Sequence, residues 1–300
     1  MFDRPYPAWP TAALIAVTHH VSQMLESCSY VRCVLVDYSK AFDTINHSIL
    51  FSKLGKLSLS GNILGWIYNF LRLLVVKQAV VANGHVSEWL PISQSIVQGS
   101  GLGPYLYIIY AADLKPLHSY IIKYADDTTL LVAEHSAVDI VQEFKNLQDR
   151  SENNKLKINL NKTKEIIFRR PSTKTIDFPA VLPGIEIVDQ IVLLGVRMTS
   201  TLSAAVHLNF SLSQANQRLY LLSQLQHQGL CGDALKILFT SLIFSKLLYA
   251  IPTFAGQLSA DDRNRYDALS RKAVKRGLIT DGFSINDLID FQDGQLFTQM

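Results

Sequence analysis

The sequence has little cysteine, little net charge and no internal repeat. Its three cysteines, Cys28, Cys33 and Cys231, form no CxxC pair, which excludes a disulfide scaffold and a zinc ribbon and indicates a reducing, intracellular compartment. The formal net charge of +3 is too small to indicate a nucleic-acid partner by itself. Low-complexity segments are also missing, so a repeat array or a biased linker is not expected.

The N-terminal residues lack a secretory signal, because no basic stretch is followed by an apolar core and a small-residue cleavage site. The membrane candidate is 237–255, whose length suits a bilayer span of about 20 residues. Lys246 lies in its middle and Pro252 near its end, and a central charge is costly in lipid. We therefore expect a buried helix ending near Pro252 and no membrane partner. Solubility without detergent would dispose of the alternative.

The composition is globular, with 48% hydrophobic and 18% charged residues in 300, enough for one large or two ordinary domains. Continuous apolar character predicts a buried strand at 31–38. Helical spacing predicts a helix at 43–54 with Asp43 as its N-cap. Further expected elements are a hairpin at 79–90 turning at Asn83-Gly84, a helix from Tyr105 to Leu114 after Pro104, paired strands within 120–132, and a helix at 138–150 with a stripe of Val138, Val141, Phe144 and Leu147.

The pattern changes after Arg170. A proline-containing loop leads to the apolar run 191–196, and helices are expected at 205–228, 233–250 and 261–276. The chain is therefore predicted to be α+β over residues 1–200 and helical over residues 201–300.

Three carboxylates stand at predicted strand ends. Asp37 ends the strand at 31–38, and Asp126 and Asp127 lie where two strands meet. Carboxylates at such places converge if their strands are neighbours, and their repulsion is relieved by a divalent cation. Mg²⁺ takes carboxylate and phosphate oxygens, and two such ions roughly 4 Å apart can assist an in-line phosphoryl displacement. The alternative is that Asp126-Asp127 is an ordinary turn.

Five strings occur in an order that resembles the reverse transcriptases of non-LTR retrotransposons. They are VLVDYSKAFDTINHSIL at 34–50, QGSGLGP at 98–104, KYADDTTLL at 123–131, NKLKINLNKTKEIIF at 154–168 and VLLGV at 192–196. The resemblance implies a right-hand polymerase with an antiparallel palm sheet covered by helices, truncated fingers and a helical thumb. It also implies RNA-directed DNA polymerase activity, with an RNA template, a DNA primer and deoxynucleoside triphosphates as partners.

The resemblance assigns roles to residues that match the family's motifs. Asp37, Asp126 and Asp127 match its catalytic metal-binding carboxylates, which would hold two Mg²⁺ ions, with Mn²⁺ as an alternative. Phe42 stands where the family keeps a bulky residue under the sugar 2′ position; the alternative is a core phenylalanine. Gln98 and Gly99 match residues that contact the incoming nucleotide.

Basic residues receive further roles. Lys162 is the candidate to protonate the departing pyrophosphate, and Lys157 and Lys164 are close competitors. A patch for nucleic-acid phosphates is expected within 263–276. The residues expected to bind the phosphates are Arg271, Lys272, Lys275 and Arg276. The alternative for this patch is an ordinary solvated helix face, because acidic residues dilute it.

The sequence also departs from the family's pattern. Ser95-Ile96-Val97 replaces a usual Gly-Val-Pro run, and Arg150 stands where tryptophan is common. Only about 30 residues precede the first motif, so we expect an N-terminally truncated fragment with part of the fingers missing. The alternatives are a catalytically inactive relic that keeps the fold, and a related polymerase such as an intron-encoded maturase.

Overall fold

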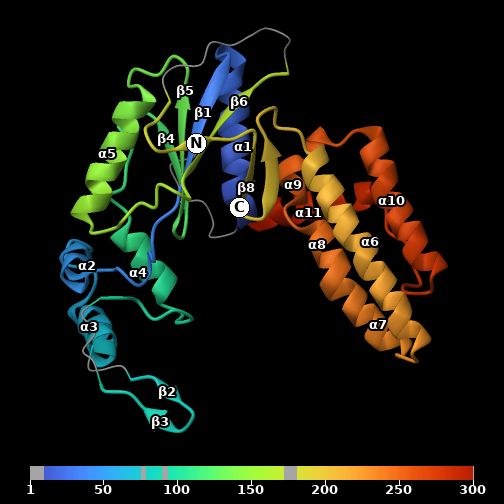
Figure 1. Cartoon of the computed structure of the whole chain (residues 1–300), viewed down its shortest axis with the longest axis horizontal. Coiled ribbons are helices and arrows are strands. Elements are labelled where there is room, and N and C mark those ends of the chain that lie inside the picture. Colours follow the sequence, from blue (N-terminus) through green and yellow to red (C-terminus); the bar gives the residue numbers. More distant parts are fainter. Residues whose placement is uncertain (1–9, 76–78, 90–93, 172–180, 300) are drawn as a thin grey trace. The chain divides into compact units, whose positions relative to one another are not determined.

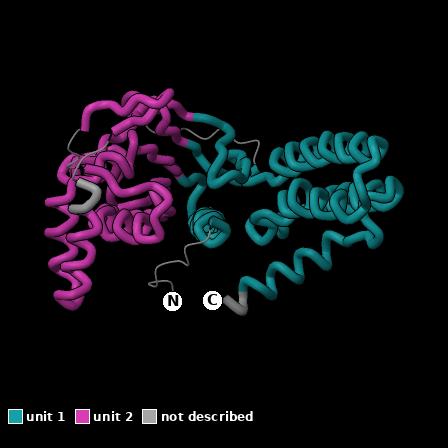
Figure 2. Tube along the Cα trace, turned by 90° about the horizontal axis from the view of Figure 1, so that it is seen from below, with its two compact units in different colours: residues 1–31, 166–176, 188–300 teal, residues 32–165, 177–187 magenta. Residues whose placement is uncertain are grey.

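A computed structural model describes residues 10–75, 79–89, 94–171 and 181–299 (Figure 1). The chain divides into two compact units (Figure 2): unit 1 is residues 1–31, 166–176 and 188–300, and unit 2 is residues 32–165 and 177–187. These units are not separated at the expected domain boundary between residues 200 and 201. The division into domains at that boundary stays a prediction.

A mixed sheet of five strands has the order β4-β5-β1-β6-β7. The division between the units falls within β1 and within β6. The strands are β1 (Tyr30–Val36), β4 (Tyr120–Tyr124), β5 (Asp127–Ala133), β6 (Lys164–Arg169) and β7 (Glu186–Ile187). β4 and β5 pair antiparallel, whereas the short β7 joins β6 in parallel. The expected α+β class is confirmed, and the sheet differs from the expected antiparallel pairing at this edge, where the short β7 pairs with β6 in parallel.

Unit 2 packs its helices on this sheet around one hydrophobic core. The helices are α2 (His47–Leu54), α3 (Gly61–Val75), α4 (Gly103–Tyr110) and α5 (Ile140–Asn153). Buried residues from β1, β5 and all four helices form the core; among them are Val34, Leu130, Leu50, Leu106 and Phe144. The core buries apolar side chains from elements that are far apart in the sequence. This shared burial helps to hold β1 and β5 side by side in the sheet.

The hairpin prediction is confirmed at its turn. β2 (Val81–Ala82) and β3 (His85–Val86) pair around Asn83 and Gly84, whose φ angles are 51° and 80°. A two-residue turn with both φ angles positive matches the right-handed twist of its strands and favours Asn-Gly.

Two helix predictions need correction. α2 begins at His47, with Asn46 and not Asp43 as its N-cap: the Asn46 side chain accepts from the Ile49 N–H. Val141 of α5 is 43% exposed, and Ile140 is buried instead. Both errors have one cause. The sequence pattern is compatible with more than one helix start and more than one buried face, and tertiary packing decides which of them the helix adopts.

Unit 1 is mainly helical. Its elements are α1 (Pro10–Ser27), β8 (Gln190–Leu193), β9 (Val196–Thr199), α6 (Ala205–His227), α7 (Gly232–Phe239), the π-helix η1 (Thr240–Phe244), α8 (Ser245–Leu248), α9 (Ile251–Phe254), the 3₁₀-helix η2 (Ala255–Gln257), α10 (Ala260–Lys275) and α11 (Ile285–Gln299). α6 packs against α7, α8 and α10 (Figure 1). Gly229, with φ at 90°, follows the end of α6 as expected.

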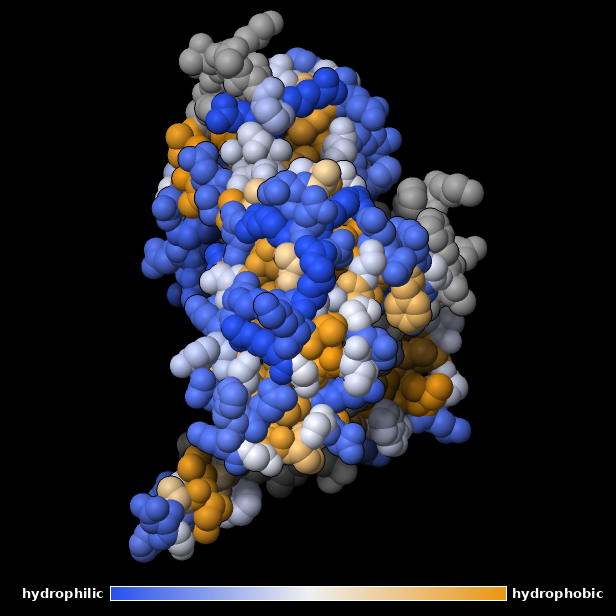
Figure 3. All heavy atoms as spheres, turned by 90° about the vertical axis from the view of Figure 1, so that its right-hand side faces the viewer, coloured by the Kyte–Doolittle hydropathy of each residue, from blue (hydrophilic) through white to orange (hydrophobic). Residues whose placement is uncertain are grey.

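In the described part of the chain, one segment, Gly232–Gln257, is long and apolar enough to cross a membrane, and 33% of its most apolar 18-residue stretch is buried. It is not one continuous α-helix, because the π-helix interrupts it and Ala250 adopts a φ of 56° between α8 and α9. The expected buried helix ending near Pro252 is therefore wrong in its end and in its burial. Hydrophobic side chains form separate patches among hydrophilic ones on the face in Figure 3. The expected lack of a membrane partner stays a prediction.

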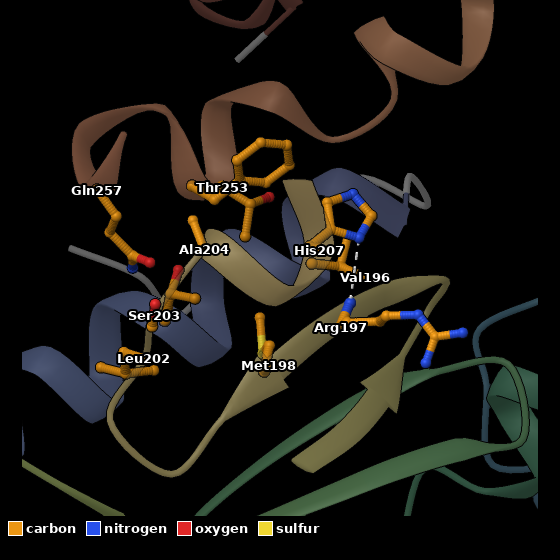
Figure 4. A pocket seen from close by; sticks show the side chains of 11 residues that line it. Val196, Arg197, Met198, Leu202, Ser203, Ala204, His207, Thr253 and Gln257 are labelled. Atoms are coloured by element: carbon orange, nitrogen blue, oxygen red, sulfur yellow. Dashed lines mark hydrogen bonds between the residues drawn. The ribbon is translucent and has the colours of Figure 1, made fainter. Parts of the chain in front are cut away.

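His207 on α6 lies in a small pocket between β9 and α9 (Figure 4). Its Nδ1 accepts the backbone N–H of Arg197 at 3.3 Å, and its ring meets the Phe254 ring edge-on at 5.0 Å between centroids. Burial, together with the smaller effect of the Arg197 charge, lowers the pKa of His207 to about 4. The imidazole is therefore neutral in the folded protein at pH values where it would be charged in the unfolded chain.

This pKa predicts acid sensitivity of unit 1. Between pH 4 and about 6.5 the unfolded chain binds a proton at His207 that the folded chain does not, so the free energy of unfolding falls as the pH falls. We expect a loss of about 2 kcal/mol from this group between pH 7 and pH 5. Urea titrations at both pH values should show a smaller difference in His207→Gln than in the wild type. Equal differences would contradict the assignment.

Candidate active site

Asp37 directly follows β1 and is half-buried. Its backbone C=O accepts the Asn159 N–H at 2.8 Å, and its own N–H donates to Thr163 Oγ1 at 3.3 Å. Tyr38 forms an isolated antiparallel bridge with Ile158. The chain beyond β1 is therefore bonded to the segment 157–163, which precedes β6.

Asp126 lies in the tight turn between β4 and β5. Tyr124 pairs with Asp127, so Ala125 and Asp126 form a two-residue turn. Ala125 has a φ of 50°, a left-handed conformation that is uncommon for alanine. The turn thus carries backbone strain, which packing of the β4–β5 hairpin must offset. The predicted pair of strands with an acidic connection is confirmed.

Asp127 is affected electrostatically by the other two carboxylates. Burial raises the pKa of Asp127, and the negative charges of Asp126 and Asp37 raise it further. Since β5 neighbours β1 in the sheet, the turn at Asp126 and the end of β1 bring like charges within reach of each other. Such repulsion is relieved by a bound cation.

The donor chemistry at this place fits a hard divalent cation, because carboxylate oxygens are the ligands that Mg²⁺ prefers. Among the described residues, however, no three His, Cys, Asp or Glu side chains are close enough to hold a metal ion together. The carboxylates therefore supply part of a ligand shell, and water or substrate phosphate would complete it. The predicted ligand roles of Asp37, Asp126 and Asp127 stay predictions.

Aromatic side chains border the carboxylates. The Phe42 and Tyr107 rings stack with centroids 4.7 Å apart. Burial raises the pKa of Tyr107, with further contributions from nearby Tyr38, Asp126 and Asp127. Phe42 also packs against the hydrophobic core, so it contributes to packing as well as to the stack with Tyr107. Its predicted role as a steric gate stays a prediction.

Gln98 and Gly99 lie on an exposed turn that is bonded to the chain after Asp37. Gln98 Nε2 donates to Asp43 Oδ1 at 3.1 Å, and the Ile96 N–H donates to the Phe42 C=O at 3.0 Å. Gly99 has a φ of 83°, and a Cβ there would meet nothing within 4 Å. The turn requires glycine for its backbone conformation, and the space beside it is open.

The three candidate lysines differ in their surroundings. Lys164 pairs with Glu186, whereas the side chains of Lys157 and Lys162 are exposed. The Lys162 N–H donates to Asn159 C=O in the turn next to Asp37. Lys162 is thus exposed on the segment that is bonded to Asp37, and a proton donor to the pyrophosphate would have to be accessible in this way. Its catalytic role stays a prediction.

The basic patch lies on α10 and its C-cap, in unit 1. Lys272 Nζ donates to Asn216 at 2.8 Å, and Arg276 donates to Ser223 at 3.3 Å. Both acceptors are on α6, so these two cations join α10 to α6. Arg271 and Lys275 are exposed, and no hydrogen bond or ion pair is assigned to their side chains in the described part of the chain. The nucleic-acid role of the patch stays a prediction.

Sequence reasoning missed Thr163 and Asn159 as neighbours of Asp37, and Tyr107 as a neighbour of Asp126. The signal for the first two was their place inside the string 154–168, which was assigned through its lysine alone. Tyr107 had no signal, since it is one apolar position in a helix of apolar positions.

Comparisons with known proteins agree with the motifs. The family described as "Reverse transcriptase (RNA-dependent DNA polymerase)" matches residues 5–198, a range that includes all five strings. A probable RNA-directed DNA polymerase from transposon BS of Drosophila melanogaster is 26% identical over 86% of this chain and 30% of that relative. The RNA-directed DNA polymerase from mobile element jockey of the same organism is 29% identical over 51% of this chain and 18% of that relative.

The chain thus spans less than a third of either curated relative. Among solved structures, telomerase from Candida tropicalis in complex with a fragment of telomeric RNA matches with a TM-score of 0.45 and 13% identity, over 92% of this chain and 48% of that one. The apo telomerase of the same organism matches with a TM-score of 0.40 and 13% identity, over 63% and 39% of the two chains. These TM-scores are too low to add to the argument.

The predicted family is confirmed by the family match and the two transposon relatives. The matched range covers the sheet, the strand-end carboxylates and the turn at Gln98, and it ends within β9. With a match over more than half of its length, this chain belongs to the reverse transcriptase (RNA-dependent DNA polymerase) family, and its relatives are of the non-LTR retrotransposon type.

Proposed function

We propose that this chain catalyses RNA-directed DNA synthesis, in which deoxynucleotides are transferred to a primer 3′ hydroxyl on an RNA template. The observation that supports the proposal is that Asp37 follows β1, that Asp126 and Asp127 lie at the start of the neighbouring strand β5, and that the charges of Asp126 and Asp37 raise the pKa of Asp127. We also propose an intracellular location, which rests on the free state of all three cysteines.

In the proposed mechanism Asp37 and Asp126, with Asp127 beside them, would hold two Mg²⁺ ions, or Mn²⁺. Bound ions would lower the pKa of the primer hydroxyl and neutralise charge on the leaving pyrophosphate. Gln98 and Gly99 would face the incoming deoxynucleoside triphosphate, and Phe42 would reject a ribose 2′ hydroxyl by steric clash. Lys162 would give a proton to the departing pyrophosphate.

The decisive experiment is primer extension on an RNA template with Mg²⁺ and the four deoxynucleoside triphosphates. Extension that depends on both the RNA and the metal supports the proposal. A folded chain that binds an RNA–DNA duplex without extending it would contradict the proposal and favour the relic.

One observation favours the relic as a second candidate. Ser95 stands at the glycine of the family's usual Gly-Val-Pro run, and its φ is 102°, a conformation that side chains rarely adopt. The Ser95 N–H donates to Ile45 C=O and its own C=O contacts His47 Nε2 at 2.8 Å. The backbone therefore keeps the glycine conformation although the glycine is gone, as expected where constraint on the sequence has relaxed.

Restoring glycine at this position should stabilise the protein. We expect Ser95→Gly to raise the free energy of unfolding by about 1 kcal/mol, because it removes the strain of a left-handed serine. Denaturant titration measures the change, and Ser136→Gly, on a turn with no such φ, is the matched control. An Ser95→Gly protein no more stable than the wild type would contradict the strain.

A further inference from the structure

The segment 157–163 is hydrogen-bonded to the backbone of Asp37 and Ser39. The Ser39 N–H donates to Lys157 C=O at 2.8 Å, and the Asn159 N–H donates to Asp37 C=O at 2.8 Å. β1 ends at Val36, so these bonds extend the ordered chain past the end of the strand. They fix the position of the carboxylate that follows it.

Thr163 completes this arrangement. Its side chain is fully buried, with 0% of the residue exposed, and its Oγ1 accepts the Asp37 N–H at 3.3 Å. The Thr163 N–H in turn donates to Asn159 C=O at 2.9 Å. One turn, 159–163, thus bonds both backbone polar groups of Asp37, one through a main-chain N–H and the other through a hydroxyl.

The hydroxyl is the part of this arrangement that a substitution can remove. Valine has nearly the shape of threonine, so Thr163→Val keeps the packing and leaves the Asp37 N–H without this acceptor. A main-chain shift at Asp37 moves its carboxylate directly, and outer groups that orient a ligand typically change metal affinity 10- to 100-fold.

We propose that Thr163 is a positioning residue for Asp37, acting through the hydrogen bond to its backbone N–H. This inference rests on the proposed function in one respect, namely that Asp37 is a metal ligand. The string 154–168 would then position Asp37 through Thr163, and this role does not depend on the lysines of the string.

The test measures Mn²⁺ affinity of the full chain by electron paramagnetic resonance of free Mn²⁺, without substrate. Thr163→Val should weaken Mn²⁺ binding about tenfold, and Thr163→Ser, which keeps the hydroxyl, should bind within about twofold of the wild type. Thr253→Val is the matched control, because Thr253 is buried and no described group bonds its hydroxyl; it should not change Mn²⁺ affinity.

Several outcomes overturn the inference. Wild-type affinity in a folded Thr163→Val protein, even with a lower melting temperature, would make Thr163 a structural residue only. Should Thr163→Val not fold, weakened Mn²⁺ binding in a folded Thr163→Ser protein would overturn it as well. A wild-type chain that binds Mn²⁺ but does not extend a primer would refute the proposed activity alone, and the affinity ratio would still decide the role of Thr163. A wild-type chain that binds no Mn²⁺ would overturn the inference together with the ligand role of Asp37.

Discussion

Replacing Asp126 with asparagine is expected to lower the rate of primer extension by roughly a thousandfold or more, because it removes a charge that the metal-assisted step requires. Asparagine has the shape of aspartate and is also common in tight turns, so the turn between Tyr124 and Asp127 should persist. The loss would be measured on an RNA template at saturating Mg²⁺ and nucleotide.

The same change should leave the fold as stable as before. The charge of Asp126 raises the pKa of Asp127, which is a repulsion that asparagine relieves. The pKa of Asp127 should therefore fall in Asp126→Asn, as NMR titration of the carboxyl would show.

Asp139→Asn provides a matched control for this experiment. Asp139 caps α5 by accepting the Gln142 N–H at 2.8 Å, and asparagine is an equally good N-cap. This variant should extend primers at the wild-type rate. Extension by Asp126→Asn at a rate comparable to that of Asp139→Asn would mean that the metal assignment is wrong.

Removing Glu165 is expected to destabilise the protein by about 3–5 kcal/mol, because it removes the carboxylate that is bonded to the buried guanidinium of Arg32. Both side chains are almost completely enclosed, at 3% and 0% exposure. They form two bonds, from Arg32 Nε to one carboxylate oxygen of Glu165 and from Nη2 to the other at 2.9 Å. Glu165→Leu should show this loss in the free energy of unfolding.

The neighbouring ion pair supplies the control. Lys164 pairs with Glu186, and these side chains are 35% and 65% exposed. Exposed pairs contribute about 0–1 kcal/mol, so Glu186→Leu should change stability little although it removes the same charge one residue away in the sheet.

A double variant then separates the charge from the packing. Arg32→Met with Glu165→Leu replaces the pair by apolar side chains, an exchange that is often neutral when the shape is retained. It should recover most of the loss seen in Glu165→Leu. A double variant as unstable as the single one would show that the packing at this place, and not an unpaired charge, limits stability.

Much of the fold could be predicted because its signals are local. The strand at 31–38, the Asn83-Gly84 turn and the hairpin around Asp126 each depend on a few adjacent residues. The helix starts and buried faces were predicted less well. The structure has Asn46 as the N-cap where Asp43 was predicted, and it buries Ile140 where Val141 was predicted. Both members of each pair suit the local pattern, so contacts with other elements made the choice.

The site shows the same division. The motif order identified Asp37, Asp126, Gln98 and their family, and the structure relates the carboxylates through the neighbouring strands β1 and β5. No local pattern could show that two of the four predicted phosphate-binding cations, Lys272 and Arg276, are bonded to α6.

The sequence by itself determined the family, the order of its five strings and the tight turns, because each depends on residues that are close along the chain. Only the tertiary structure decided the partners of buried polar groups. Thr163 meets Asp37 across 126 residues, and Glu165 meets Arg32 across 133. Glu143, one residue of an amphipathic helix, is fully buried and accepts the N–H groups of Leu117 and His118. A buried polar group must find a partner wherever the fold brings one, and that partner is set by packing of the whole chain.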